Sequence, residues 1–257
     1  GIMKYNLGYL FELAVVITQK ELKIRYKSSF FGYLWSVANP LLFAMIYFFV
    51  FKMIMKIQIP NYTLFLITGL FPWQWFSSSV TNSLFSFLNN AQIIKKVVFP
   101  RSVIPISNVL MEFFHFCCTI PVIVFFLFIY DKTPHIDWLW GIPILGVAQM
   151  IMSSGLALAL ASLNLFFRDL ERFVTLGIMV LFYFTPILYD IKMIPDKYKW
   201  VIDFNPVAIL INAWRGLLMN GELSSLVLTK LYVFAIFMFL IGVSIFNKLK
   251  FRFAEIL

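Results

Sequence analysis

Charged residues are scarce in this chain of 257 residues, in which Asp, Glu, Lys and Arg together make up 13%. A soluble globular domain usually has about 25% charged and ~45–50% apolar residues. Here the hydrophobic residues reach 61%. The shortage of charge therefore excludes an ordinary soluble domain and predicts an integral membrane protein.

Other shortages narrow the function. The sequence has no Gly-x-x-x-x-Gly-Lys-Ser/Thr stretch, the loop that usually cradles ATP phosphates. Cys117 and Cys118 are adjacent, and this spacing suits neither a disulfide nor a metal site. His115 and His135 are the only histidines, and no Ser/His/Asp set has a catalytic context. We expect a chain that is not an enzyme and binds no metal or cofactor itself.

The basic residues are best explained as signals of membrane topology. The net charge is +9, from 21 Lys and Arg against 12 Asp and Glu. Most of these cations flank apolar runs, where they set topology and contact anionic lipids. A nucleic-acid partner is therefore the least favoured explanation.

Residues 4–29 predict a cytoplasmic amphipathic interface helix. Lys20, Lys23 and Lys27 share one side of its helical wheel. Glu21 and Arg25 have the spacing of an i,i+4 ion pair. The opposite side is apolar and consists of Leu13, Ala14, Ile17 and Ile24.

Six apolar segments predict six transmembrane helices in an all-α fold. At ~1.5 Å per residue, about 20 residues cross a ~30 Å hydrocarbon core. We expect one transmembrane domain over residues 30–250, with both termini on the same side. The segments are 31–55, 64–88, 103–130, 138–166, 173–189 and 226–246.

The positive-inside rule predicts the orientation. Placing both termini in the cytoplasm leaves only Lys52, Lys56 and Lys132 in the short loops outside. The cytoplasmic side then collects Lys4, Lys20, Lys23, Arg25, Lys27, Lys95, Lys96, Arg101, Arg168, Arg172, Lys248, Lys250 and Arg252.

Residues 190–225 are too polar to cross the membrane as written. Asn205 suits an N-cap, Pro206 the first helical position and Gly221 a C-cap. A helix from Pro206 to Met219 would be only ~21 Å long. Its apolar face, which includes Trp214, needs burial. We therefore expect a re-entrant or interfacial segment with short outer gate helices, rather than a surface hairpin, and assign Asn205, Pro206 and Trp214 to this outer gate.

Several motifs together resemble the membrane subunits of ABC-2-type polysaccharide exporters, the permeases for O-antigen, capsule and teichoic acid. The resemblance covers nearly the whole chain. Its motifs are KELKIRYK from Lys20, GYLW from Gly32 with Pro40, GLFPW from Gly69, IKKVVFPR from Ile94 with Pro105, NLFFRD from Asn164, and Asn205-Pro206.

The resemblance implies a permease of the bacterial inner membrane. Such a permease works as a homodimer with two copies of an ABC ATPase, which bind the ATP and Mg. It moves a lipid-linked glycan from the cytoplasm to the outer side of the membrane. An ABC-2 exporter of a lipid or drug is the alternative within the class, and a proton-coupled transporter using Glu112 and His115 is the alternative outside it.

Aromatic side chains are the candidate lining of the substrate path. Aromatic residues make up 19% of the chain, and their rings can stack on sugars without requiring one hydroxyl pattern. Phe43 and Tyr47 are one helical turn apart, and we expect Phe182 and Tyr189 on one face of the fifth span. The resemblance implies that the first and fifth spans border the path, which adds Trp35. For any single ring, a lipid-facing, core or interfacial position is the commoner alternative.

The loop 89–101 is the candidate coupling helix for the ATPase, with Phe99 as its anchor. A solvated turn that enforces topology is the alternative. The amphipathic helix predicted at residues 4–29 is expected to make a second contact with the ATPase, with membrane-surface binding as its alternative. The predicted coupling residues are Lys20, Lys23, Lys27, Lys95, Lys96, Phe99 and Arg101.

Two further polar groups are assigned to structure. Arg168 and Asp169 are placed where the fourth span leaves the membrane, and we expect an ion pair or a helix-end anchor there. The third span carries one polar stripe, and a Glu-to-His pair within it can satisfy itself. We assign the stripe to contacts between helices rather than to a proton relay. It consists of Asn108, Glu112, His115 and Thr119.

Overall fold

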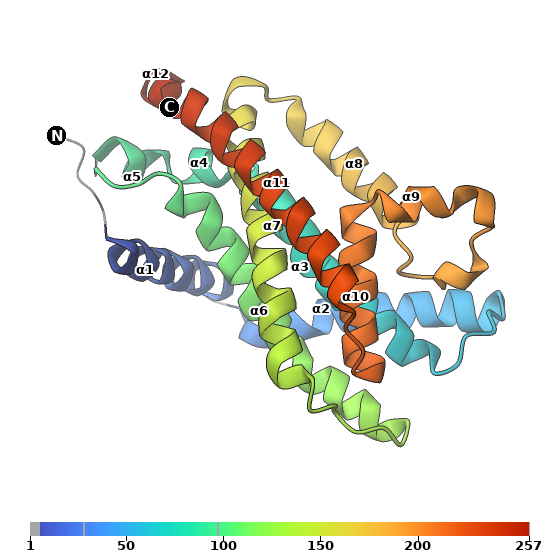
Figure 1. The fold of residues 1–257 in the computed structure, drawn as a ribbon. Helices are drawn as coiled ribbons and strands as arrows, with labels where there is room; N and C mark the ends of the chain where they lie inside the picture. The colour runs from blue at the N-terminus through green and yellow to red at the C-terminus, as the bar shows by residue number, and fades with distance from the viewer. Residues whose placement is uncertain (1–5, 28, 97, 257) are drawn as a thin grey trace.

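The computed structural model describes residues 6–27, 29–96 and 98–256, in which all regular elements are helices (Figure 1). The predicted all-α class is therefore confirmed. Residues 4, 5 and 28 of the predicted interface helix lie outside the described residues. The helices are α1 (Leu7–Tyr26), α2 (Trp35–Tyr47), α3 (Tyr62–Ser83), α4 (Ser86–Asn89), α5 (Ala91–Lys96), α6 (Val103–Ile129), α7 (Trp138–Phe166), α8 (Leu170–Phe184), α9 (Lys199–Asp203), α10 (Pro206–Asn220), α11 (Ser225–Leu249) and α12 (Phe253–Ile256).

Four helical stretches are long and apolar enough to cross a membrane by length and composition. A bent pair, Asp196–Asp203 with Pro206–Asn220, passes the same test only as a unit and turns by 93°. The chain therefore has four, or with this pair five, candidate spans among its described residues. The four are Gly32–Ile54, in which α2 continues as a π-helix from Phe48, and Val103–Ile129, Trp138–Phe166 and Ser225–Arg252.

Two predicted spans differ from the helices observed. The segment 64–88 is broken, because α3 ends at Ser83 and the short α4 follows. The segment 173–189 is α8, which has 15 residues and is ~22 Å long. It ends at Phe184, two residues before Pro186, since the residue preceding a proline disfavours the helical conformation. Tyr189 thus lies beyond the helix, and its predicted shared face with Phe182 is wrong.

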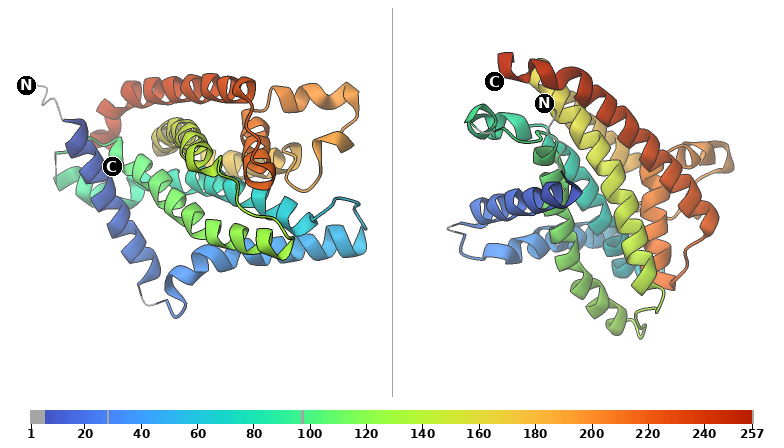
Figure 2. Two further views of the ribbon diagram at one scale, coloured as in Figure 1. Left: turned by 60° about the horizontal axis from the view of Figure 1, so that its bottom comes forward. Right: turned by 60° about the vertical axis from the view of Figure 1, so that its left-hand side comes forward.

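The first and last helices lie on the same side of the molecule. The start of α1 and the short α12 are near α4 and α5, whereas α9 and the turn between α6 and α7 lie away from them (Figures 1 and 2).

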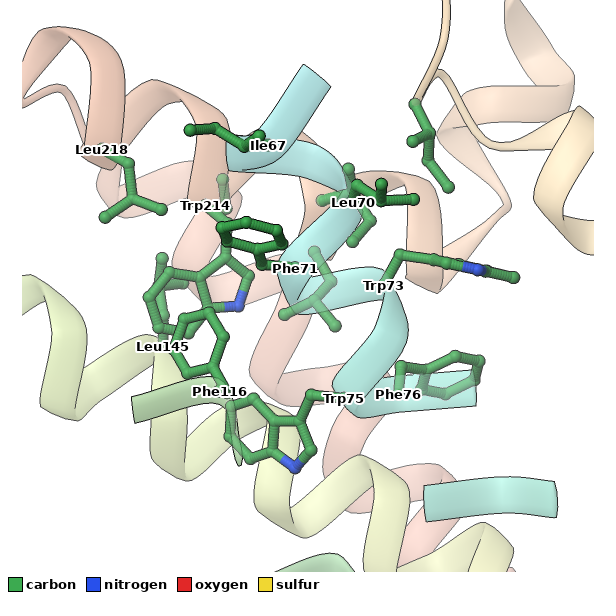
Figure 3. Close-up of a cluster of buried hydrophobic side chains, with 14 of the residues drawn as sticks. Ile67, Leu70, Phe71, Trp73, Trp75, Phe76, Phe116, Leu145, Trp214 and Leu218 are labelled. Carbon is green, nitrogen blue, oxygen red and sulfur yellow. The ribbon is translucent and has the colours of Figure 1, made fainter. Parts of the chain in front are cut away.

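The core is built around α3, which contacts α2, α6, α7 and α10. Figure 3 shows its aromatic centre, where Trp75, Phe116 and Trp214 come together. Trp214 is fully buried, and its indole N–H donates to Gln149 Oε1 at 2.7 Å. Gln149 in turn donates to the carbonyl of Pro72 at 2.9 Å. Trp214, predicted as part of the outer gate, is therefore a core residue.

Helices α7 and α11 make the most extensive helix pairing, and two glycines permit it. A Cβ on Gly242 would collide with the carbonyl of Gly155. The close approach of the two backbones therefore requires glycine at this contact.

Helix α10 begins and ends as its sequence predicts. The Asn205 side chain accepts hydrogen bonds from the N–H groups of Val207 and Ala208 at 3.0 and 3.2 Å, and Pro206 is the first helical residue. Gly221 ends the helix with φ of +69°, a left-handed conformation that favours glycine. The apolar face of α10 is buried against α3, α7 and α11, and α9 meets it at the 93° bend. A surface hairpin is excluded, and the bend is that of a broken or re-entrant span.

Arg215 of α10 is buried and forms no ion pair within the described chain. Its guanidinium donates to the carbonyls of Pro186, Ile187 and Phe65 at 2.6, 3.0 and 3.3 Å. It also lies 3.7 Å from the centroid of the Phe65 ring, a cation–π contact. A Cβ at Gly69 would collide with this guanidinium, so the glycine of the GLFPW motif makes room for the arginine.

The neighbouring residues of the same turn are held in the same way. The Tyr62 hydroxyl donates to the carbonyl of Leu188 at 2.8 Å, and the Asn205 amide donates to the Thr185 hydroxyl at 3.3 Å. Together with the Arg215 contacts, these bonds hold each residue from 185 to 188 with a side chain from α3, from α10 or from the cap of α10. We call this segment the 185–188 turn. It fixes the end of α8 to the core.

We expect the substitution Arg215→Met to lower the melting temperature of the purified protein. The carbonyls of Pro186 and Ile187 would lose their donor, and a buried acceptor left without a partner costs roughly 1–3 kcal/mol. The measurement is thermal unfolding in detergent. The matched control is Arg168→Met, since Arg168 is exposed and makes no ion pair in the part of the chain that the structure describes. Equal melting temperatures for the two variants would contradict the role of Arg215.

Candidate functional site

An aromatic groove lies between α2, α3 and α8. Its volume is ≈520 Å³. Tyr47 stacks on Phe182 with ring centroids 5.7 Å apart, and Phe43 stacks on Tyr47 at 6.5 Å. Trp73 contacts Phe182 from α3 at 5.5 Å, and Tyr183 also lines the groove. The first and fifth predicted spans thus place their aromatic side chains together.

Three of the five predicted path residues line this aromatic groove, namely Phe43, Tyr47 and Phe182. Tyr189 does not, and its hydroxyl donates to the carbonyl of Tyr183 at 2.8 Å. Trp35 lies instead in an adjoining cavity, where its ring is 39% exposed and makes an edge contact with Phe31.

This second cavity, which we call the polar chamber, has a volume of ≈380 Å³. It lies between the C-terminal end of α1, the start of α2, and α3 and α6. Asn39, Gln74 and Ser78 line both the polar chamber and the aromatic groove. The two cavities therefore adjoin at these three side chains.

A network of charged and polar groups forms the far wall of the polar chamber. Glu112 of α6 is 5% exposed. Its Oε1 accepts hydrogen bonds from Arg25 of α1 at 2.9 Å and from Asn82 of α3 at 2.8 Å. Its Oε2 lies 2.9 Å from Nδ1 of His115. Both carboxylate oxygens are thus occupied, and one side chain joins three helices.

Tyr26 extends the network to the first span. Its hydroxyl is hydrogen-bonded to Nε2 of His115 and to the Ser36 hydroxyl, each at 2.9 Å. Burial raises the pKa of the Tyr26 phenol, so the hydroxyl stays protonated at neutral pH. The network therefore connects α1 to α2 as well as to α3 and α6.

The sequence indicated part of this network. Glu112, His115 and Thr119 do share a wall of the chamber, and Glu112 contacts other helices as assigned. The predicted pair of Glu21 with Arg25 is wrong, because Glu21 pairs with Lys20 at 3.6 Å and Arg25 reaches Glu112. Helical spacing identifies neighbours on one helix, but it gives no signal for a partner 87 positions away.

Helix α1, predicted as an interface helix, packs on α6. Ala14, Thr18 and Leu22 form its buried face, and Thr18 donates to the carbonyl of Ser107 at 3.3 Å. Ile24, expected on the apolar face, is 58% exposed, because it lies on a different side of the helix from Ala14, Thr18 and Leu22.

The predicted coupling residues divide into exposed and engaged side chains. Lys20 donates to Asn90 Oδ1 at 3.2 Å, and Arg101 donates to the carbonyl of Lys250 at 3.1 Å. Phe99 is half-buried against the chain's own cluster around Phe87, so it does not protrude as an anchor. The exposed members of the set are Lys23, Lys27, Lys95 and Lys96. Val98, the residue before Phe99, was not predicted and is 84% exposed.

Arg168 and Asp169 lie in the turn between α7 and α8, as expected. Both are exposed, and neither forms an ion pair within the described ranges. Asp169 stands at the N-cap position of α8 without a capping hydrogen bond. The ion-pair version of their structural role is therefore not supported.

Comparison with known proteins identifies the class. The family of ABC-2 type transporters matches residues 12–219 of the chain. The chain therefore belongs to this family. It is 66% identical over 99% of its length to the O-antigen export system permease protein RfbA of Klebsiella pneumoniae, 98% of which is covered.

More distant relatives transport related polymers. The O-antigen export system permease protein RfbA of Myxococcus xanthus is 31% identical, with 82% of each chain covered. The polysialic acid transport protein KpsM of Escherichia coli is 22% identical, covering 89% of this chain and 90% of that protein.

Proposed function

We propose that this chain is the transmembrane permease of an ATP-driven exporter that moves a lipid-linked, O-antigen-like polysaccharide across the bacterial inner membrane. The aromatic groove is the observation that carries the proposal. It combines the stacked rings of Phe43, Tyr47 and Phe182 in a chain that is 66% identical to an O-antigen export permease. Rings of this kind stack on successive sugars and let the polymer slide, since they fix no single hydroxyl.

The chain is a transport subunit rather than an enzyme, and ATP hydrolysis takes place on a separate ABC ATPase. ATP and Mg are bound by that partner, and this chain binds no cofactor. Support comes from the family and from the absence of a phosphate-binding loop in the sequence. The exposed cations Lys23, Lys27, Lys95 and Lys96 suit the rim of the ATPase contact, and Val98 suits its apolar centre.

A second copy of the chain completes the path. The aromatic groove is open, and exposed apolar side chains lie around it, such as Met45 of α2, Phe49 of the π-helical continuation of α2, and Phe184 of α8. In a homodimer these side chains would enclose the groove. The membrane arrangement is six spans with both termini cytoplasmic, in which α3 and the short α8 complete the set and α10 is re-entrant on the outer side.

Loss of two groove rings should slow export. We expect the double substitution of Phe43 and Tyr47 by Ala to lower surface polysaccharide by up to about thirtyfold, since each ring contributes roughly 1 kcal/mol of contact and ~1.4 kcal/mol corresponds to a factor of ten. The measurement is surface glycan together with membrane protein level in cells that carry only the variant permease.

The matched control replaces Phe237 and Leu240 by Ala. Both side chains are exposed on α11, and neither lines the groove or the chamber. Normal surface glycan from a well-expressed groove variant would remove Phe43 and Tyr47 from the path.

Reversing two exposed charges should weaken the ATPase complex. We expect Lys95→Glu with Lys96→Glu to reduce copurification of the ATPase severalfold, because both cations would become repulsive at an acidic rim. The control is Lys192→Glu with Lys197→Glu, two exposed cations in the segment proposed to lie outside. Equal recovery of the ATPase with both variants would refute the coupling role of this loop.

Labelling of single cysteines tests the orientation. In a chain with Cys117 and Cys118 replaced by Ala, a membrane-impermeant maleimide should label Lys197→Cys in intact spheroplasts and Arg252→Cys only in inside-out vesicles. The expectation rests on the excess of Lys and Arg at the termini and inner loops. Labelling of both positions from the same face would rule out the six-span arrangement.

A further inference from the structure

We propose that the polar chamber is a recognition site for one neutral sugar ring of the transported glycan. This inference rests on the proposed function and adds a specificity site to it. The chamber adjoins the aromatic groove at Asn39, Gln74 and Ser78. A sugar held there lies directly in line with rings that guide the rest of the polymer.

The side chains at this junction are available to a ligand. Asn39, Gln74 and Ser78 make no side-chain hydrogen bond with any described residue, whereas their amide and hydroxyl groups offer both donors and acceptors. Gln74 and Ser78 are half-buried, and Asn39 is exposed. A pyranose presents hydroxyls that both donate and accept, so it matches this set.

Two other hydroxyls of the aromatic groove are engaged within their own helices. Thr175 donates to the carbonyl of Glu171 at 2.8 Å, and Ser77 donates to that of Gln74 at 3.4 Å. The phenol groups of Tyr47 and Tyr183 also line the groove and make no hydrogen bond with a described residue. Both side-chain amides of the groove, Asn39 and Gln74, lie where it meets the chamber. The junction is therefore the part of the groove that offers amide groups to a ligand.

The charges of the chamber favour a neutral ligand. Arg25 lines the chamber, and its guanidinium is paired with Glu112. His115 is occupied at both ring nitrogens, by Glu112 and Tyr26. A phosphate group in the chamber would face the Glu112 carboxylate without an unpaired cation to balance it. The diphosphate of a lipid carrier is thus expected outside this cavity.

The volume and the lining of the polar chamber fit one sugar ring. The volume of ≈380 Å³ lies at the lower end of the ~300–1,000 Å³ range of ligand sites. Trp35 supplies an exposed indole beside the polar groups, on which the C–H face of a sugar can stack. Hydrogen-bonding sites reject analogues that lack the matching hydroxyl, so the chamber would select a sugar that the groove alone would tolerate.

The test uses the complete permease–ATPase complex in nanodiscs. The ATPase rate is measured against the concentration of lipid-linked glycan isolated from producing cells. The double variant Asn39→Leu with Gln74→Met keeps side-chain volume but loses both amides. We expect its half-saturating concentration to rise roughly ten- to thirtyfold, because two neutral hydrogen bonds are lost.

The matched control is Thr229→Val on α11, which removes a hydroxyl that already has a partner and lines neither cavity, and which should leave the half-saturating concentration unchanged. The second probe is a polyprenyl diphosphate without sugar, to which the double variant and the wild type should respond alike. An equally weakened response to this probe would mean that the chamber binds the phosphate, which overturns the proposal.

The experiment distinguishes a failure of the proposed function from a failure of the sugar site. If no lipid-linked glycan stimulates the wild-type complex, the proposed function fails. If the wild type responds and the double variant has the same half-saturating concentration, the sugar site alone is wrong. Should the double variant not assemble with the ATPase, Gln74→Met by itself is expected to show a rise of roughly fivefold, and its equality with the wild type would be decisive.

Discussion

The carboxylate of Glu112 is the interaction on which the chamber end of the molecule depends. A buried charge is costly unless it is paired and hydrogen-bonded, and Glu112 meets this need with Arg25, Asn82 and His115 from three helices. Because the partners come from α1, α3 and α6, none of these helices can shift alone without leaving a charge unpaired. Helix α1 is therefore tied to the wall of the polar chamber.

Arg215 plays the corresponding part at the other end. It has no carboxylate partner among the described residues, and it uses the carbonyls of Phe65, Pro186 and Ile187 instead. The carbonyls of Pro186 and Ile187 follow the end of α8 and would otherwise lack partners in an apolar surrounding. Holding this turn against α3 also sets the position of Phe182, the ring on which Tyr47 stacks. The geometry of the aromatic groove thus depends on a buried cation in α10.

Two kinds of contact divide the proposed transport task. Stacked rings give a surface that accepts many sugars, whereas the free amides of Asn39 and Gln74 demand matching hydroxyls. The two surfaces adjoin in the fold, so a permease of this kind can select its glycan at one point and remain permissive along the rest of the path. Arg25 and Tyr26 bond to the walls of the chamber, so α1 is joined directly to this point.

The sequence by itself determined the membrane class, the all-α fold, the family and the caps of α10, because hydropathy, composition, motif order and residues such as Asn205 and Gly221 act locally. It also placed Phe43, Tyr47 and Phe182 on the right helices for a common groove. Only the tertiary structure decided that Trp214 belongs to the core and that Arg25 pairs with Glu112 rather than Glu21. These outcomes depend on contacts between residues distant in sequence, and helical periodicity carries no information about which helices meet.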